Sequence, residues 1–264
     1  MTLHTIASGS EGNCLLLRCG STNLLIDAGI SLRRIKAALA ALGLDMEDIH
    51  AILLTHAHTD HIAALGTLCK HHQTPLYASA GAAAQICDKF GAAQYQLRTV
   101  RAGEPFTIGA VTVTPFPTSH DAWGSMDYRV DGEGGSMGIL TDTGYVTDEA
   151  CDALMGVDLL VLESNHDVEW LRSGPYPYYL KERILGAYGH LSNDDAARFA
   201  AEMARRGTKE IVLAHLSREN NTPARALDTV QRALDSAGCA VRLSAAPRCE
   251  VSRCYEVEVS PCRK

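Results

Sequence analysis

The sequence predicts an α/β or α+β fold in which helices cover both outer faces of the sheets. Short apolar runs alternate with segments of helical period, and neither repeats nor linkers interrupt the 264 residues. The hydrophobic fraction of 46% suits an ordinary globular fold with a sizeable core. A chain of this length is within reach of one large domain or two small ones.

Strands are predicted where short apolar runs are bounded by turn residues. Nine segments meet this description: residues 3–8, 14–19, 23–29, 50–55, 111–116, 125–130, 137–142, 158–164 and 210–215. Tight turns join the first three, and the run at 50–55 is apolar enough for a buried strand.

Helices are predicted from a 3.6-residue period and from residues that start and stop helices. Residues 31–43 place apolar side chains at 32, 35, 39 and 42, with Ser31 as the N-cap and Gly43 as the stop. Three more helices are expected, at 60–72, 193–206 and 222–237.

Composition limits the classes of function. No apolar run approaches the ~20 residues of a membrane span, and the N-terminus lacks the features of a signal peptide. Nine cysteines without an export signal favour reduced thiols, so we expect a cytoplasmic protein with no membrane partner. The net charge of −7 does not indicate a nucleic-acid binder, but it does not exclude one, because bound metals add positive charge where a phosphate must sit.

The segment THAHTDH at residues 55–61 gathers three histidines and an aspartate directly after a predicted buried strand. Such groups are costly to bury without partners. In an extended segment, residues two apart face the same way, so His56 and His58 can reach one ion together. Asp60 and His61, where the next helix starts, point to a neighbouring position. This arrangement suits two metals rather than one.

Three more predicted strands end close to a side chain that can bind a metal: His120, Asp142 and His215. Imidazole and carboxylate are the expected ligands of zinc or manganese. A lone histidine such as His4 is more often a solvated or core residue. The dense cluster at 56–61 strengthens the case for the other three together, so the sequence predicts a metal site.

The order LLIDAG, THAHTDH, SH, TDTG and AHLS resembles the metallo-β-lactamase superfamily over nearly the whole chain. The resemblance implies an αβ/βα sandwich, two mixed β-sheets flanked by helices, with metals at one edge. The family pattern implies two divalent ions, the first held by His56, His58 and His120, the second by Asp60, His61 and His215, with Asp142 as a bridge.

Asp27 matches the family's early aspartate, which implies that it supports the ligand loops. A simple turn-capping aspartate is the alternative. Zinc, manganese or iron would suit these ligands. Two such ions ~4 Å apart can share a water and lower its pKa toward about 7, which implies hydrolysis. The ligands alone do not choose between lactam, thioester, lactone and phosphodiester substrates.

Two further residues favour a phosphodiester. His190 in GHLSN lies just before the helix predicted at 193–206, and Glu163 ends an apolar strand, where an acid needs a partner. In the nuclease branch that includes ribonuclease Z, a similarly placed histidine is the general acid, and a glutamate is paired with it. By this resemblance His190 protonates the leaving oxygen, Glu163 supports it, and Asp60 steers the nucleophile. A surface His190 and a locally satisfied Glu163 are the alternatives.

The spacing between the candidate ligands limits the attachments to the core. Only 21 residues separate His120 from Asp142, and 72 separate Asp142 from His215. By the family pattern, the first interval leaves no room for the tRNA-gripping arm of many ribonuclease Z enzymes. The second is too short for the extra domain of the β-CASP nucleases. We therefore expect one hydrolase domain over residues 1–264.

A narrower resemblance spans residues 8–221. The segments SGSEGNC, SHDA, TDTGYVTDE, ESNHD, SGPYPYYLKERILGAYGHLSN and LAHLSREN resemble the bacterial YycJ family, also called WalJ. This implies a 5′→3′ DNA exonuclease with a suggested place in DNA repair, and DNA as the partner. Two departures are visible: Ser164 stands where a small apolar residue is expected, and WGSMDY after SHDA is less typical and could alter a substrate wall.

The same resemblance suggests substrate contacts. Ser8, Ser10 and Asn13 lie in a segment able to form an anion-binding nest, although a plain hairpin turn is as good an interpretation. The block 173–193 supplies further candidates: Lys181 and Arg183 for backbone phosphates, Tyr176, Tyr178 and Tyr179 for base stacking, and Ser192 and Asn193 beside His190. An apolar and basic helix face packed on the sheet would explain the same block.

Two rival functions remain at this point. A thioester or lactone hydrolase of the glyoxalase II type would share THAHTDH but would not need His190. A non-enzymatic module that binds nucleic acid or a partner is disfavoured by the complete ligand set. The oligomeric state is left open by the sequence.

Overall fold

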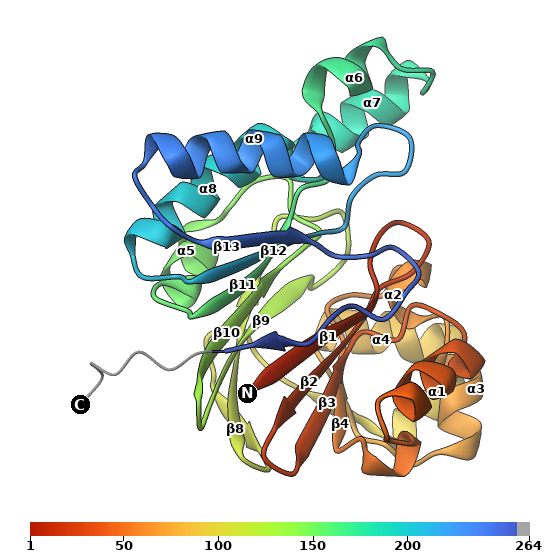
Figure 1. Cartoon of the computed structure of the whole chain (residues 1–264). Coiled ribbons are helices and arrows are strands. Elements are labelled where there is room, and N and C mark those ends of the chain that lie inside the picture. The colour runs from red at the N-terminus through yellow and green to blue at the C-terminus, as the bar shows by residue number, and fades with distance from the viewer. Residues whose placement is uncertain (258–264) are drawn as a thin grey trace.

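The computed structural model describes residues 1–257 and has the predicted architecture. Two seven-stranded mixed sheets lie face to face, with helices on both outer faces (Figure 1). This confirms the αβ/βα sandwich. No helix within residues 1–257 is both long and apolar enough to cross a membrane. The eight cysteines in this range are free thiols, and Cys262 lies outside the described residues.

The first sheet combines an antiparallel half with a parallel half. Its strands, in spatial order, are β14 (Tyr255–Glu256), β1 (Thr2–Ala7), β2 (Cys14–Cys19), β3 (Thr22–Ile26), β4 (Ala51–Leu53), β5 (Leu76–Ala78) and β6 (Leu97–Thr99). Pairing is antiparallel from β14 to β3 and parallel from β3 to β6.

The second sheet repeats this plan. Its strands, in spatial order, are β13 (Arg242–Ala245), β12 (Glu210–Ala214), β11 (Leu159–Glu163), β10 (Gly135–Leu140), β9 (Met126–Gly132), β8 (Val111–Pro117) and β7 (Phe106–Ile108). Pairing is parallel from β13 to β10 and antiparallel from β10 to β7.

Helices cover the outer face of each sheet, and two further helices project from the sandwich. Those that pack beside the first sheet are α1 (Leu32–Ala41), α2 (Thr59–Ile62), α3 (Leu65–His71) and α4 (Ala80–Lys89), with two 3₁₀ turns at Met46–Asp48 and Gly91–Tyr95. Those on the second sheet are α5 (Asp148–Leu154), α8 (Asn193–Arg205) and α9 (Pro223–Ser236). The pair α6 (Val168–Ser173) and α7 (Tyr178–Leu185) stands apart from both layers (Figure 1).

Alternating side chains divide the core into three parts. On β11, Leu159 and Val161 face the space between the sheets, while Leu160 and Leu162 face the helices. The central layer is therefore apolar on both sides, and each sheet is also sealed by its own helices. This packing fixes the strands whose carboxyl ends carry the polar residues of interest.

The nine predicted strands and the helices at 31–43, 193–206 and 222–237 are confirmed, with ends shifted by a few residues. The helix predicted at 60–72 is two helices, α2 and α3, separated at 63–64. Three strands end earlier than predicted because Asp27, Asp142 and His215 have positive φ angles of 61°, 51° and 53°. A left-handed residue cannot continue a β-strand.

Candidate metal centre

The predicted site residues meet at the carboxyl ends of strands from both sheets. Loops after β3, β4, β8, β10, β11 and β12 supply Asp27, the 56–61 cluster, His120, Asp142, Glu163 at its strand end, and His215. Several of these residues border a cavity of about 260 Å³. Its lining is Ser10, His58, Asp60, His120, Asp142, Asn165, Tyr176, Leu180, Arg183, Ile184, His190, His215 and Ser217.

The backbone is strained at this site. Asp27, Asp142 and His215 are the non-glycine residues with positive φ among residues 1–257. The left-handed conformation costs a non-glycine residue about 1–2 kcal/mol. Such strain persists only where the surrounding structure enforces it, and it is concentrated at functional sites.

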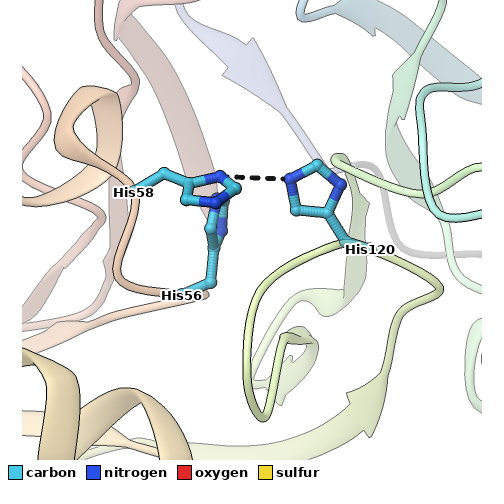
Figure 2. A group of neighbouring side chains, drawn as sticks. All are labelled: His56, His58 and His120. Atoms are coloured by element: carbon cyan, nitrogen blue, oxygen red, sulfur yellow. Dashed lines mark hydrogen bonds between the residues drawn. The ribbon is translucent and has the colours of Figure 1, made fainter. Parts of the chain in front are cut away.

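One group consists of His56, His58 and His120 (Figure 2). His58 Nδ1 and His120 Nε2 are 3.3 Å apart. Two nitrogens bound to one tetrahedral zinc at ~2.05 Å would be separated by ~3.3 Å. The opposite ring nitrogens are held elsewhere: His56 Nδ1 lies 3.0 Å from Thr55 Oγ1, and His120 Nδ1 lies 3.2 Å from the carbonyl of Gly189. The arrangement can hold one metal ion.

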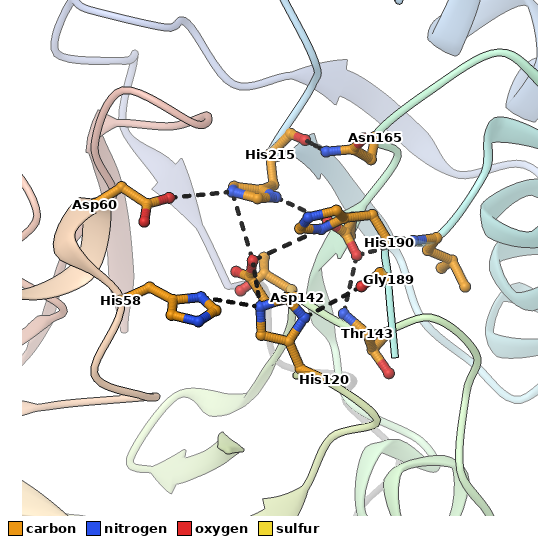
Figure 3. A network of polar contacts seen from close by, with 12 residues as sticks. His58, Asp60, His120, Asp142, Thr143, Asn165, Gly189, His190 and His215 are labelled. Atoms are coloured by element: carbon orange, nitrogen blue, oxygen red, sulfur yellow. Dashed lines mark hydrogen bonds and ion pairs between the residues drawn. The ribbon is translucent and has the colours of Figure 1, made fainter. Parts of the chain in front are cut away.

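A second group consists of Asp60, His61 and His215. Asp60 Oδ2 lies 3.5 Å from His61 Nε2 and 3.9 Å from His215 Nε2. Asp142 lies between the two groups, with Oδ2 3.3 Å from His61 Nε2 and Oδ1 3.7 Å from His120 Nε2 (Figure 3). The structure thus brings all seven predicted ligands together, and Asp142 has the position expected of a bridge.

Asp27 anchors the 55–61 loop through hydrogen bonds on the side away from the ligand groups. Its carboxylate accepts hydrogen bonds from the backbone N–H of Thr55 (2.9 Å), the Thr55 hydroxyl (2.9 Å) and His61 Nδ1 (2.7 Å). The last bond places the His61 proton on Nδ1 and leaves Nε2 to face Asp60 and Asp142. A histidine that binds metal normally has such an acceptor on its other nitrogen.

The donor atoms fit divalent metal ions. His56 Nε2, Asp142 Oδ2 and His215 Nε2 are buried, face the two groups, and have no hydrogen-bond partner. Buried polar atoms without partners are uncommon. Burial lowers the pKa of His215, but the carboxylates of Asp142, Asp60 and Glu163 outweigh it and raise that pKa to about 10. The carboxylates of the site therefore favour positive charge at its centre.

Glu163 is fully buried and accepts four hydrogen bonds. Oε1 accepts from His190 Nδ1 (2.9 Å) and His215 Nδ1 (2.8 Å). Oε2 accepts from the backbone N–H groups of Thr143 (3.1 Å) and Leu191 (3.0 Å). Burial raises the pKa of Glu163, but His190 and His215 hold it well below its usual value. A charged Glu163 therefore orients both histidines, and the sequence indicated only its pairing with His190.

His190 lines the cavity, and the hydrogen bond between its Nδ1 and Glu163 leaves Nε2 free of that contact. His190, Glu163, Asp142 and His215 are close enough to form a further ligand group. The Glu163 carboxylate is engaged in its four hydrogen bonds, however, so we interpret His190 as a cavity residue rather than a ligand.

Of the three residues that could form an anion-binding nest, one lines the cavity and two are buried. Ser10 is exposed and lines the cavity. Ser8 is buried, and its hydroxyl accepts from the backbone N–H of His215 (2.8 Å). Asn13 lies beside the second group, with its amide 3.0 Å from His61 Nε2. Ser8 and Asn13 therefore support the ligands instead of facing the opening.

Among the polar substrate-contact candidates of residues 173–193, only one lines the cavity. Arg183 lines the cavity and pairs with Asp121, whereas Lys181 donates to the backbone carbonyl of Arg172 (2.7 Å), outside the cavity. Ser192 caps α8. Asn193 is only 2% exposed and accepts from the hydroxyl of Ser164 (2.6 Å). Asn193 is therefore buried beside Ser164, and neither residue is part of the cavity lining.

The aromatic candidates lie around the projecting helices. Tyr176 lines the cavity, while Tyr178 and Tyr179 are 76% and 74% exposed outside it. Trp123, in the less typical WGSMDY segment, is 67% exposed. It belongs to the loop that carries His120 and is not part of the cavity lining.

The sequence did not single out Asp121, Asn165 and Thr55 as residues of the site. Asp121 is in the quoted SHDA segment, and its Oδ1 lies 3.7 Å from His58 Nε2. Asn165 lines the cavity and donates to the backbone carbonyl of His215 (2.9 Å). Each is adjacent to a residue that was singled out, and this proximity was the available signal.

Comparison with known proteins adds independent findings. Residues 22–216 match the family described as Beta-lactamase superfamily domain. The chain is 38% identical over 246 residues to exodeoxyribonuclease YycJ of Bacillus anthracis, covering 91% of this chain and 92% of that protein. It is 40% identical over 221 residues to exodeoxyribonuclease WalJ of Streptococcus pneumoniae, covering 82% and 81% respectively. The crystal structure of the metallo-β-lactamase fold protein YhfI from Bacillus subtilis shares the fold, with a TM-score of 0.70, 21% identity, and coverage of 97% of this chain and 98% of that one.

Proposed function

The chain belongs to the beta-lactamase superfamily and, within it, to the YycJ/WalJ family, so it is a metal-dependent hydrolase, and we propose that it is a dinuclear DNA exonuclease acting 5′→3′. The names of the two relatives support DNA as the substrate. A role in DNA repair is part of the proposal.

One observation carries the phosphodiesterase assignment: His190 stands in the cavity with Nδ1 bonded to the buried Glu163. A DNA phosphodiester releases an alkoxide, which is a poor leaving group without a proton. A histidine beside the ligand groups can supply that proton. Thioester hydrolysis releases a thiolate and has no comparable need.

In this proposal the first metal is held by His56, His58 and His120, the second by Asp60, His61 and His215, with Asp142 shared. Two divalent ions supply a lowered water pKa and charge for the phosphoryl oxygens. Zinc or manganese is proposed, and iron would also suit these ligands. Asp60, partly exposed in the cavity, orients the attacking water and accepts its proton. Glu163 stabilises the imidazolium form of His190, which protonates the leaving oxygen and becomes neutral imidazole.

The cavity wall suits a nucleic-acid chain. Arg183 supplies a cation for a backbone phosphate, Tyr176 supplies a ring for a base, and Ser10 supplies a hydroxyl at the opposite loop. These contacts are proposed from their positions in the lining. The single-domain organisation and the cytoplasmic location stay predictions.

The test is a digestion time course with purified protein and added Mn²⁺ or Zn²⁺. The substrates are duplex DNA labelled at one end, with and without a 5′ phosphate, and matching RNA. We expect stepwise loss from the 5′ end of DNA. If metal-loaded protein cleaves neither polymer but hydrolyses a chromogenic thioester, the function is that of a glyoxalase II-type hydrolase and the proposal fails.

A further inference from the structure

A histidine that binds a metal through one ring nitrogen carries its hydrogen on the other, and that N–H needs an acceptor. Four of the five proposed ligand histidines have one within hydrogen-bond distance. The pairs are His56 with Thr55 Oγ1 (3.0 Å), His61 with Asp27 (2.7 Å), His120 with the Gly189 carbonyl (3.2 Å) and His215 with Glu163 (2.8 Å). His58 is the exception.

Asp121 is the candidate acceptor for His58. His58 Nδ1 faces His120, so the hydrogen belongs on Nε2, and Asp121 Oδ1 lies 3.7 Å from that nitrogen. A movement of under about 1 Å would bring the pair into hydrogen-bond range. Asp121 follows His120 in the sequence, and its side chain is 32% exposed, so it has room to make this movement.

The other oxygen of Asp121 binds a cation from the opposite wall. Oδ2 accepts from Arg183 Nε (2.5 Å), and Arg183 lies on α7, which lines the cavity with Leu180 and Ile184. None of the α7 side chains is fully buried. The Arg183–Asp121 pair is therefore a direct link between this exposed helix and the loop that carries His120.

We propose that Asp121 is a positioning residue that serves both the metal centre and the substrate wall. Its Oδ1 accepts the Nε2–H of His58 and fixes that ring, while its Oδ2 holds Arg183 over the cavity for a backbone phosphate. One carboxylate thus links a metal ligand to the phosphate-binding cation. The inference rests on the proposed function, because it takes His58 as a ligand and Arg183 as a phosphate contact.

The two oxygens can be separated by substitution. Asp121→Ala removes the acceptor for His58 and the anchor for Arg183. Asp121→Asn keeps an oxygen for His58 but loses the charge that holds Arg183. Arg183→Ala leaves the His58 acceptor in place. Metal affinity should therefore follow the order Arg183→Ala, Asp121→Asn, Asp121→Ala, from strongest to weakest.

The first measurement is Zn²⁺ binding, by competition with a chromogenic chelator and without any substrate. We expect Asp121→Ala to bind Zn²⁺ about 10–100-fold more weakly, as is usual when a partner of a metal-bound histidine is lost. Asp121→Asn should retain most of the affinity, and Arg183→Ala should stay within about twofold of the parent. Glu182→Ala, which removes an exposed carboxylate of α7, is the matched control.

The second measurement is KM for end-labelled DNA at saturating Mn²⁺. Asp121→Ala, Asp121→Asn and Arg183→Ala should all raise KM, because each leaves the cation absent or unanchored. Far-UV circular dichroism and a thermal melt check that each variant is folded. If Asp121→Ala does not fold, the difference between Asp121→Asn and Arg183→Ala still tests the division of roles.

Two results would overturn the proposal. Zn²⁺ affinity of Asp121→Ala within twofold of the parent would show that Asp121 does not serve His58. An Asp121→Asn variant as weak as Asp121→Ala would show that the acceptor oxygen is not what matters. Zn²⁺ binding is independent of the substrate, so inactivity on DNA would count against the proposed function and not against this assignment.

Discussion

The metal centre and the α6–α7 projection face the same cavity but are built differently. Around the metal centre, the candidate ligands are mostly buried, and three of the polar residues are held in strained backbone. Four of the five ligand histidines also have a partner for the ring nitrogen that faces away from the ligand groups. On α7, no side chain is fully buried, and Tyr178 and Tyr179 are largely exposed. Chemistry at a metal requires fixed geometry, whereas binding a flexible polymer tolerates movement. Substitutions in the first region should change metal content and turnover, and those in the second should change substrate affinity.

The largest expected effect is that of Glu163→Gln. A glutamine side chain must direct its NH₂ either at two histidine N–H groups or at two backbone N–H groups, so one pair loses its acceptor. We expect turnover on DNA to fall by about 10³-fold, Zn²⁺ content to fall, and the free energy of unfolding to drop by about 3 kcal/mol. Steady-state kinetics, metal analysis and urea unfolding measure these.

Glu202→Gln is the matched control, because Glu202 is a surface residue of α8 that pairs with Arg206. It should leave all three quantities unchanged. If Glu163→Gln kept the turnover and metal content of the parent, the buried metal centre would tolerate the loss of a central charge. The proposed difference between the metal centre and the α6–α7 projection would then be wrong.

Asp27→Asn should have the next largest effect. Asparagine accepts the left-handed backbone at this position, so the fold should survive. Its amide NH₂ facing His61 would favour the tautomer with the hydrogen on Nε2, the nitrogen directed at the second ligand group. We expect metal affinity to fall by about 10–100-fold, measured by chelator competition.

Asp45→Asn provides a comparison for this variant, because Asp45 is exposed and caps the 3₁₀ turn that precedes β4, whereas the ligand loop follows that strand. Parent-like metal affinity in Asp27→Asn would contradict the role of Asp27 in fixing His61.

Tyr176→Ala tests the other region. Tyr176 lines the cavity, and stacking of a base on an aromatic ring contributes about 1–3 kcal/mol. We expect binding of single-stranded DNA, measured by fluorescence anisotropy in Ca²⁺, to weaken by about 5–30-fold with metal content unchanged. Tyr176→Phe should retain most of the affinity. Tyr178→Ala, outside the cavity, should change it by less than about twofold, and an equal loss in Tyr178→Ala would remove the distinction between them.

Arg183→Ala should have the smallest effect of the four. An exposed cation at a phosphate contributes affinity that salt screens, so we expect KM to rise about 3–10-fold at low salt. The slope of log affinity against log salt should fall by about one. Arg172→Ala, on α6 and outside the cavity lining, is the charge-matched control. An unchanged slope would exclude Arg183 as a phosphate contact.

The sequence predicts the sandwich because its long apolar strands and its capped helices carry strong periodic signals. It does not predict β5, β6 and β7, which are only three residues long and, unlike the equally short β4 within 50–55, do not lie in a longer apolar run. It also extends β3, β10 and β12 too far, because positive φ at Asp27, Asp142 and His215 is imposed by the packed site and leaves no local signal.

The site was predictable where chemistry alone demands a residue type. The dense imidazole and carboxylate cluster, and single ligands at strand ends, lie together as expected. Tertiary contacts were not predictable: Glu163 orients His215 as well as His190, and Asn193 turns inward to Ser164. Lys181 and Arg183 are two residues apart on one helix, yet only Arg183 faces the cavity.

The central claim is that His190 supplies a proton to the leaving oxygen, and His190→Ala on two substrates tests it most directly. DNA releases an alkoxide, whereas bis-p-nitrophenyl phosphate releases a phenolate that leaves without protonation. With metal content shown to equal that of the parent, turnover on DNA should fall by about 10²–10⁴-fold, and turnover on bis-p-nitrophenyl phosphate by less than about tenfold. Equal losses on both substrates, or full activity on DNA, would contradict the account.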